Sequence, residues 1–175
     1  MLTIVADIES NGLLPAVSVV HCLCVQIFET GEMFSFADHA GYLPLEMGWE
    51  LLLTADYVVG HNFMHYDAAV IQWVADVAIE PARIIDTYDL CEILIDQFEM
   101  QRMDYELHVK GLMPYNLINK FKLEAWGYRL GRLKGTFGKT ADWKIFSDEM
   151  VQYCADDVLL NADLYRFFLE MGDKL

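Results

Sequence analysis

The sequence predicts an α/β fold in which helices flank a mixed five-stranded sheet. Short apolar, β-branched runs are confined to the first half of the chain, and helical spacing of apolar residues dominates the second half. The first three predicted strands follow one another directly, whereas the other two alternate with helices, so the sheet should begin as an antiparallel meander. A chain of 175 residues, 55% of them hydrophobic, can bury a substantial core. We therefore expect one domain over residues 1–175.

The five predicted strands are short apolar runs that end at polar or turn-forming residues. The second run is the longest, and a Thr30–Gly31 turn signal follows it. The short run after this turn should pair back as the second arm of a hairpin. The predicted strands are residues 2–6, 17–28, 33–36, 57–60 and 83–86.

The predicted helices carry apolar residues three or four positions apart. Gly131 is typical of the position just after a helix, and Ser147 is typical of an N-cap, so a loop rich in Gly and Lys over 132–146 should separate the last two helices. The predicted helices are residues 43–53, 65–78, 88–98, 116–130 and 148–171. This order of elements resembles that of ribonuclease H-like folds.

The net charge of −15 is distributed unevenly along the chain. As a total, it argues against nucleic acid, because phosphate binding normally requires a basic face. Residues 120–144, however, contain seven of the twelve basic residues and two acids, which makes this segment +5 and the rest of the chain −20. The segment is either a path for a nucleic-acid strand or a solvated basic loop. Its basic residues are Lys120, Lys122, Arg129, Arg132, Lys134, Lys139 and Lys144.

The cysteines and the N-terminus predict a cytoplasmic protein. The four cysteines include no CxxC pair and are interpreted as buried thiols in a reducing compartment. The longest stretch without Asp, Glu, Lys or Arg, residues 10–28, contains Asn11, Gly12 and Pro15 and is a poor membrane span. No basic region precedes the first apolar run, so we expect no signal peptide.

Carboxylates at the ends of predicted elements form the candidate site. Asp7 and Glu9 follow the first strand, and because residues two apart in an extended chain point the same way, both can face one point in space. Asp67 opens a predicted helix. Tyr153 and Asp157 are four residues apart in the last helix and share one face, close to its apolar stripe. An unpaired carboxylate there would be costly.

Four carboxylates that converge from three elements suit two divalent ions about 4 Å apart, the arrangement used for phosphodiester cleavage. A ligand set of hard oxygen atoms without Cys or His favours Mg²⁺ or Mn²⁺ over zinc. A Tyr hydroxyl beside such a site could orient the attacking water. Each cluster also has a simpler interpretation, namely a solvated strand end or an acid in the first turn of a helix.

Taken together, these motifs resemble the DnaQ-like (DEDD) family of 3′–5′ exonucleases. The matches are D-x-E at Asp7 and Glu9, N-x3-(F/Y)-D from Asn62 to Asp67, and Y-x3-D from Tyr153 to Asp157. Gln152 stands where the histidine branch of the family has His, so the chain resembles the tyrosine branch. Segments 7–14, 60–62, 86–87, 123–131 and 134–135 are further similar to the N-terminal proofreading exonuclease domain of podovirus-type bacteriophage family A DNA polymerases.

The resemblance implies a role for each matching residue. Asp7, Glu9 and Asp157 would hold one metal ion, and Asp7 with Asp67 a second. Tyr153 would position the water. Leu13 would be a wedge beside the terminal base or would serve as loop packing, and Asn62 would lie near the scissile end. Apart from the resemblance, the basic segment offers Arg129, Arg132 and Lys134 as candidate phosphate contacts. Phe121 takes a place where the phage domains often have His, so we assign it no contact.

The implied activity is that of a 3′–5′ exodeoxyribonuclease with two Mg²⁺ or Mn²⁺ ions. It would release 5′-mononucleotides from single-stranded or frayed DNA 3′ ends, as in proofreading during phage replication in the bacterial host cytoplasm. A separate DNA polymerase is the expected partner. Two alternatives remain open: an RNA-trimming exonuclease of the same fold and a non-catalytic module that docks on a polymerase.

Overall fold

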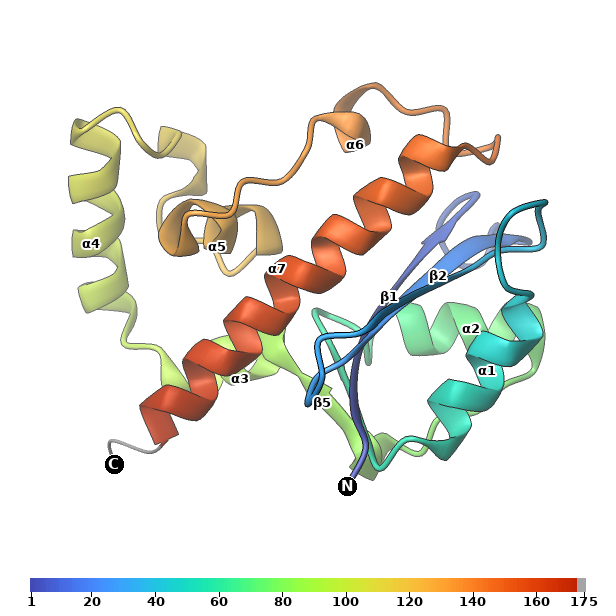
Figure 1. The fold of residues 1–175 in the computed structure, drawn as a ribbon. Coiled ribbons are helices and arrows are strands. Elements are labelled where there is room, and N and C mark those ends of the chain that lie inside the picture. Colours follow the sequence, from blue (N-terminus) through green and yellow to red (C-terminus); the bar gives the residue numbers. More distant parts are fainter. Residues whose placement is uncertain (173–175) are drawn as a thin grey trace.

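The computed structural model describes residues 1–172 and contains the predicted mixed five-stranded sheet (Figure 1). The strands lie in the order β3-β2-β1-β4-β5. The first three form an antiparallel meander, and β4 and β5 continue the sheet in parallel with β1. Their bounds are β1 Thr3–Ser10, β2 Val20–Ile27, β3 Met33–Phe36, β4 Tyr57–Gly60 and β5 Ile84–Asp86.

Helices cover both faces of this sheet. Figure 1 shows α1 (Leu45–Thr54) and α2 (Asp67–Ala75) on one face and the long helix α7 (Asp148–Gly172) crossing the other. The side chains of β1 alternate between these two layers. Ile4, Ala6 and Ile8 pack in the core cluster that includes α1 and α2, whereas Val5 packs in the cluster under α7. The odd-numbered residues of β1 therefore face α7.

The second half of the chain departs from the prediction in two places. The helix expected over 88–98 is divided into α3 (Thr87–Leu94) and α4 (Gln97–Val109). Asp96 lies at the break and caps α4, because its carboxylate accepts hydrogen bonds from the first backbone N–H groups of that helix. α4 extends away from the sheet (Figure 1).

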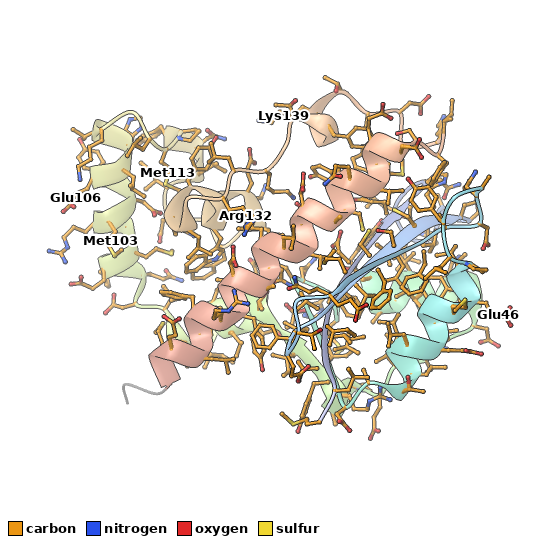
Figure 2. All side chains as sticks on the ribbon, in the orientation of Figure 1. Glu46, Met103, Glu106, Met113, Arg132 and Lys139 are labelled. Atoms are coloured by element: carbon orange, nitrogen blue, oxygen red, sulfur yellow. The ribbon has the colours of Figure 1, made fainter. Side chains whose placement is uncertain are left out.

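The helix expected over 116–130 is also shorter than predicted. A 3₁₀ turn at Tyr115–Leu117 comes first, and α5 spans Leu123–Leu130. Gly131 follows it with φ +76°, the left-handed conformation expected after a helix. The connection between α5 and α7 contains one further short helix, α6 (Phe137–Thr140). Figure 2 shows Arg132 and Lys139 on this connection. Another 3₁₀ turn, Pro81–Arg83, precedes β5.

β1 continues to Ser10, well past the predicted end, so Asp7 and Glu9 lie inside the strand and not in the loop after it. The predicted burial of all four cysteine thiols is confirmed. Within residues 1–172, none of the helices has both the length and the apolar character that a membrane span requires.

Candidate active site

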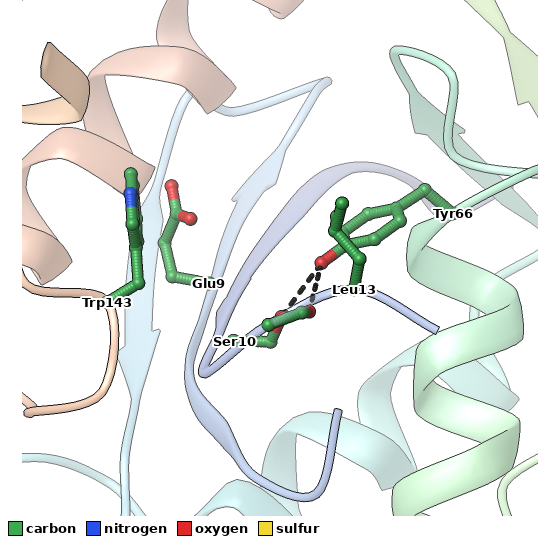
Figure 3. Close-up of a pocket in the computed structure, with 6 residues that line it drawn as sticks. Glu9, Ser10, Leu13, Tyr66 and Trp143 are labelled. Carbon is green, nitrogen blue, oxygen red and sulfur yellow. Dashed lines mark hydrogen bonds between the residues drawn. The ribbon is translucent and has the colours of Figure 1, made fainter. Parts of the chain in front are cut away.

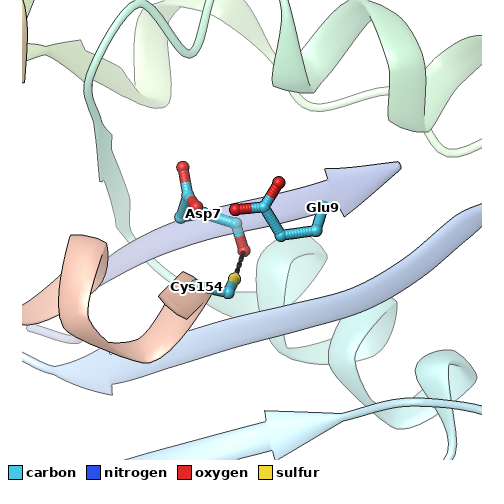
Figure 4. A group of neighbouring side chains, drawn as sticks. All are labelled: Asp7, Glu9 and Cys154. Atoms are coloured by element: carbon cyan, nitrogen blue, oxygen red, sulfur yellow. Dashed lines mark hydrogen bonds between the residues drawn. The ribbon is translucent and has the colours of Figure 1, made fainter. Parts of the chain in front are cut away.

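The structure brings the predicted carboxylates together in one cleft. Asp7 and Glu9 project from β1 toward α7, as strand alternation requires, and Asp157 faces them from α7. Figure 4 shows Asp7 and Glu9 close together on the same face of β1. Asp67, the first residue of α2, and Tyr153, one turn before Asp157, complete the wall of the cleft.

Asp67 is fixed by the strand that carries its partners. Its Oδ1 accepts a hydrogen bond of 3.2 Å from the backbone N–H of Ile8, the residue between Asp7 and Glu9. The Asp67 side chain is almost fully buried. This hydrogen bond joins the start of α2 to β1 and so keeps the carboxylates of Asp7, Glu9 and Asp67 close together.

Burial raises the pKa of each of these carboxyl groups, and repulsion by neighbouring carboxylates adds to the effect. Loss of solvation is the main cause at all four, and it raises the pKa of Glu9 to about 9, of Asp67 to about 8 and of Asp157 to about 6. The pKa of Asp7 is also well above its ordinary value, because burial is reinforced by the charges of Asp67 and Glu9. Such a cluster is costly unless cations compensate it.

Asp157 of the cleft forms an ion pair with Lys134, which lines the adjacent pocket. Lys134 Nζ lies 2.5 Å from Asp157 Oδ2, and the lysine side chain is only 15% exposed. The other carboxylate oxygen, Asp157 Oδ1, is buried and has no hydrogen-bond partner among residues 1–172. One oxygen of this carboxylate is therefore free to bind a further positive ligand.

The cleft fits hard divalent cations through its oxygen atoms. The carboxylates of Asp7 and Glu9 and the thiol of Cys154 offer possible ligand atoms that all lie within 4.8 Å of one another. Burial raises the pKa of the Cys154 thiol, which donates a hydrogen bond of 3.2 Å to the Asp7 carbonyl oxygen. Mg²⁺ and Mn²⁺ prefer hard oxygen ligands to sulfur, so the donors that suit them here are the carboxylate oxygens.

A second, more apolar pocket lies beside the carboxylates (Figure 3). Glu9 and Trp143 form one side of it, and Leu13 and Tyr66 the other. Leu13 is 71% exposed, which excludes the alternative that it serves as loop packing. The Tyr66 hydroxyl donates to the Gly12 carbonyl at 2.9 Å and so holds the loop that presents Leu13.

Asn62 lines the carboxylate cleft in a left-handed backbone conformation, with φ +59°. Its backbone N–H donates to Asp86 Oδ1 at 2.8 Å, and the N–H of Met64 donates to the other oxygen of Asp86. Asp86 thus shapes the turn before Asp67. The neighbouring His61 hydrogen-bonds through Nδ1 to the Thr87 hydroxyl at 2.9 Å and also lines the cleft.

Sequence reasoning missed the contributions of His61, Trp143 and Cys154. Trp143 lines both the carboxylate cleft and the apolar pocket, and its carbonyl contacts His21 Nε2 at 3.0 Å. The pair Asp142–Trp143 ahead of α7 is the local sequence signal for Trp143. No local pattern indicates Cys154, because its hydrogen bond to the Asp7 carbonyl oxygen depends on the packing of α7 against β1.

The predicted phosphate contacts are each paired with an acid. The structure does not support this role for Arg129, because its guanidinium makes a buried ion pair with Asp104 and its side chain is only 7% exposed. Arg132 pairs with Asp163 at 2.6 Å but stays 47% exposed. Lys134 is mostly buried: it pairs with Asp157 and lines the pocket next to the carboxylate cleft.

The sequence is similar to two bacteriophage polymerases. It is 28% identical over 190 aligned residues to the DNA-directed DNA polymerases of Escherichia phage T7 and Enterobacteria phage T3. These alignments cover 95% of this chain and 26% of each polymerase, so the chain spans about a quarter of the length of these relatives. No protein-family model matches the sequence.

Solved structures of nucleases share the arrangement of strands and helices. Brucella melitensis NrnC with bound Mg²⁺ is 18% identical with a TM-score of 0.59, over 97% of this chain and 75% of that one. The Aedes aegypti Nibbler EXO domain is 11% identical with a TM-score of 0.58, over 94% and 76%. The Trypanosoma brucei RRP6 catalytic core, a mutant form, is 15% identical with a TM-score of 0.55, over 97% and 42%.

The fold is that of the DnaQ-like exonucleases. This confirms the ribonuclease H-like class predicted from the order of elements. In the DnaQ-like fold of this chain, the cleft lies where β1, the start of α2 and the middle of α7 meet.

Proposed function

We propose that this chain is a divalent-metal-dependent 3′–5′ exonuclease that acts on DNA. The observation that carries the proposal is the convergence of Asp7, Glu9, Asp67 and Asp157 with Tyr153 on one cleft. Carboxylates buried at this density require cations, and phosphodiester hydrolysis is the chemistry that such a cation pair serves. Residues 1–175 would form a single exonuclease domain.

Asp7, Glu9 and Asp157 would hold one divalent ion, and Asp7 with Asp67 a second. When bound, Mg²⁺ or Mn²⁺ supplies an activated water and stabilises charge on the leaving oxygen. The Tyr153 hydroxyl would orient the attacking water, since it lines the same cleft.

The apolar pocket would receive the terminal nucleotide. Leu13 would lie against the terminal base as a wedge, and the aromatic rings of Tyr66 and Trp143 offer stacking surfaces beside it. Asn62 would lie near the scissile end. A single strand fits such a pocket more readily than a duplex, which favours single-stranded or frayed 3′ ends and release of 5′-mononucleotides.

DNA is preferred as substrate because the similar sequences belong to DNA polymerases of phages T7 and T3. This similarity also favours proofreading during phage DNA replication, with a polymerase as partner. The structure of NrnC bound to pGG, a relative in fold, supports a nucleotide substrate more generally. An RNA-trimming role therefore remains an outcome of the test.

The decisive test uses DNA oligonucleotides labelled at the 3′ or the 5′ end. With Mg²⁺ or Mn²⁺, we expect immediate loss of the 3′ label as a mononucleotide and stepwise shortening of 5′-labelled strands, and EDTA should abolish both. The Asp7→Asn variant should be inactive while its circular dichroism and melting remain those of a folded protein. An RNA oligonucleotide of the same sequence should be degraded more slowly.

The remaining outcomes separate the alternatives. Faster degradation of RNA than of DNA would assign the chain to RNA trimming. If neither substrate is degraded with any metal, and Asp7→Asn is indistinguishable from the wild type, the chain is a non-catalytic module.

A further inference from the structure

Lys134 is turned inward, although its sequence context suggests a surface residue. It lies in the segment between α5 and α6, and its Nζ is 2.5 Å from Asp157 Oδ2. The same ammonium lies 4.8 Å from the centroid of the Tyr153 ring. Lys134 thus contacts both residues through which α7 contributes to the cleft.

The ammonium acts as a partial counter-ion for the whole carboxylate cluster. Its charge lowers the pKa of Asp7 and Glu9 as well as that of Asp157, against the larger effect of burial. Four carboxylates and one ammonium leave three negative charges without compensation when all are ionised. Lys134 therefore stabilises the cluster without neutralising it.

A divalent ion and Lys134 would compete for the same carboxylate. Lys134 holds Asp157 Oδ2, and the other oxygen, Oδ1, is buried without a partner. An ion on either oxygen would lie within a few ångströms of the ammonium, and repulsion between like charges is strong in a cleft shielded from water. Both cations cannot occupy this carboxylate without a large electrostatic cost.

The glycines on either side of Lys134 leave room for this lysine to change position. Gly131 and Gly135 flank it, and neither has any atom close to the position of a side chain. These two glycines therefore do not block a movement of Lys134, although the carbonyl group of Arg132 packs against Gly127 of α5. A displaced Lys134 would remain near the cleft, because the pocket that it lines with Gly138 and Tyr153 shares Tyr153 and Trp143 with the cleft.

We propose that Lys134 is a resident cation of the carboxylate cleft, that a divalent ion displaces it from Asp157, and that the freed ammonium binds the terminal phosphate. Two divalent ions would neutralise the four carboxylates, so the single charge of Lys134 would match that of one phosphodiester. The last step rests on the proposed function, whereas the displacement by a metal ion does not.

The displacement is tested by calorimetric titration of Mn²⁺ into the wild type and the Lys134→Met variant. Without the competing ammonium, the variant should bind Mn²⁺ about tenfold more tightly. Lys139→Met is the matched control, because Lys139 lies close by in α6 but is 69% exposed and pairs with Glu124 at 3.4 Å. Its affinity for Mn²⁺ should stay near that of the wild type.

Equal or weaker Mn²⁺ binding by Lys134→Met would overturn the proposal, because it would mean that Lys134 supports the metal ligand. Failure of the wild type to bind Mn²⁺ would overturn it as well. Nuclease activity is not measured in this experiment. A chain that binds Mn²⁺ as expected but leaves DNA intact would refute the proposed function and leave the displacement standing.

A measurement on the wild type covers the case in which Lys134→Met does not fold. Lysines are modified with an amine-reactive acylating reagent, with and without Mn²⁺, and located by mass spectrometry. Lys134 should react slowly without the metal and several-fold faster with it, whereas the exposed Lys139 should react equally in both conditions. A Lys134 reactivity that Mn²⁺ leaves unchanged would overturn the proposal.

Discussion

Asp7 and Glu9 face α7 because side chains alternate along β1, so half of a cation site is built into a core strand. Val5 points the same way and packs beneath α7, whereas Ile4 and Ile8 fill the opposite side of the sheet. A shift of one residue in the strand register would turn the acids toward α1 and α2. The position of the carboxylates is therefore fixed by the same packing that stabilises the sheet.

This burial makes the stability of the metal-free protein depend on pH. The pKa of Glu9 is raised to about 9 from an ordinary 4.5, so between these values the folded state binds more protons than the unfolded state. The free energy of unfolding should consequently fall as the pH rises from about 5 to about 9. Thermal melting in EDTA should show a decreasing Tm over this range.

Two comparisons identify the source of that pH dependence. Glu9→Gln removes one titrating group and should flatten the decrease in Tm, and saturating Mn²⁺ should reverse it by favouring the ionised carboxylates. A Tm that stays constant or rises with pH in EDTA would contradict the raised pKa values.

The Tyr153 hydroxyl is expected to act in the chemical step and not in metal binding. Tyr153→Phe should lower kcat by about 100-fold, at the lower end of the range for assisted proton transfer, with little change in Mn²⁺ affinity. Single-turnover kinetics and calorimetry would measure the two effects separately. A large loss of Mn²⁺ affinity with normal kcat at saturating metal would assign Tyr153 to the metal site instead.

At the scale of elements, α4 is joined to α5 through one buried ion pair. Asp104 on α4 is fully buried, and its carboxylate receives two hydrogen bonds of 2.8 Å from Arg129 on α5. It also accepts from the backbone N–H of Asn119, so the turn between the helices is fixed by the same group. Because Arg129 is held in this buried pair, it is unavailable to DNA although it belongs to the +5 segment.

Removal of one partner would leave an uncompensated buried charge. Arg129→Met should reduce the free energy of unfolding by about 3–5 kcal/mol, and any folded fraction should keep its KM for DNA. Arg102→Met is the control, because Arg102 pairs with Glu99 on the exposed face of α4 and should contribute less than about 1 kcal/mol. Urea denaturation of both variants would measure the difference. A raised KM with unchanged stability would restore Arg129 as a phosphate contact.

The strands and the four carboxylates could be predicted because their signals are local. Alternation places Asp7 with Glu9, and helical spacing places Tyr153 with Asp157, so a short window of sequence contains each arrangement. The break between α3 and α4 also has a local cause, because Asp96 is the N-cap of α4. The prediction of one helix over 88–98 did not take this residue into account. The position of Lys134 had no such cause, because its partner Asp157 is brought to it only by the crossing of α7.

At the scale of the whole molecule, the charge distribution along the chain does not translate directly into a basic surface. Within the +5 segment, Arg129 and Lys134 are turned inward to Asp104 and Asp157. Arg132 remains 47% exposed, although it pairs with Asp163. The path of a DNA strand near the cleft would thus depend on fewer cations than the sequence suggests, and the acidic remainder would disfavour extended non-specific binding.

Neutralising Arg132 tests whether the segment contacts DNA. Arg132→Gln should raise KM several-fold and leave kcat nearly unchanged. The slope of log(kcat/KM) against log[salt] should become shallower by about 1, the value expected for the loss of one phosphate contact. Arg166→Gln is the matched control, because Arg166 pairs with the same Asp163 at 2.9 Å and is similarly exposed. Unlike Arg132, it lies on α7, one turn after Asp163. If both variants change KM equally, the effect comes from release of the Asp163 charge and not from a lost phosphate contact. If neither changes KM or the salt slope, the basic segment is a solvated loop, and DNA is held by the cleft alone.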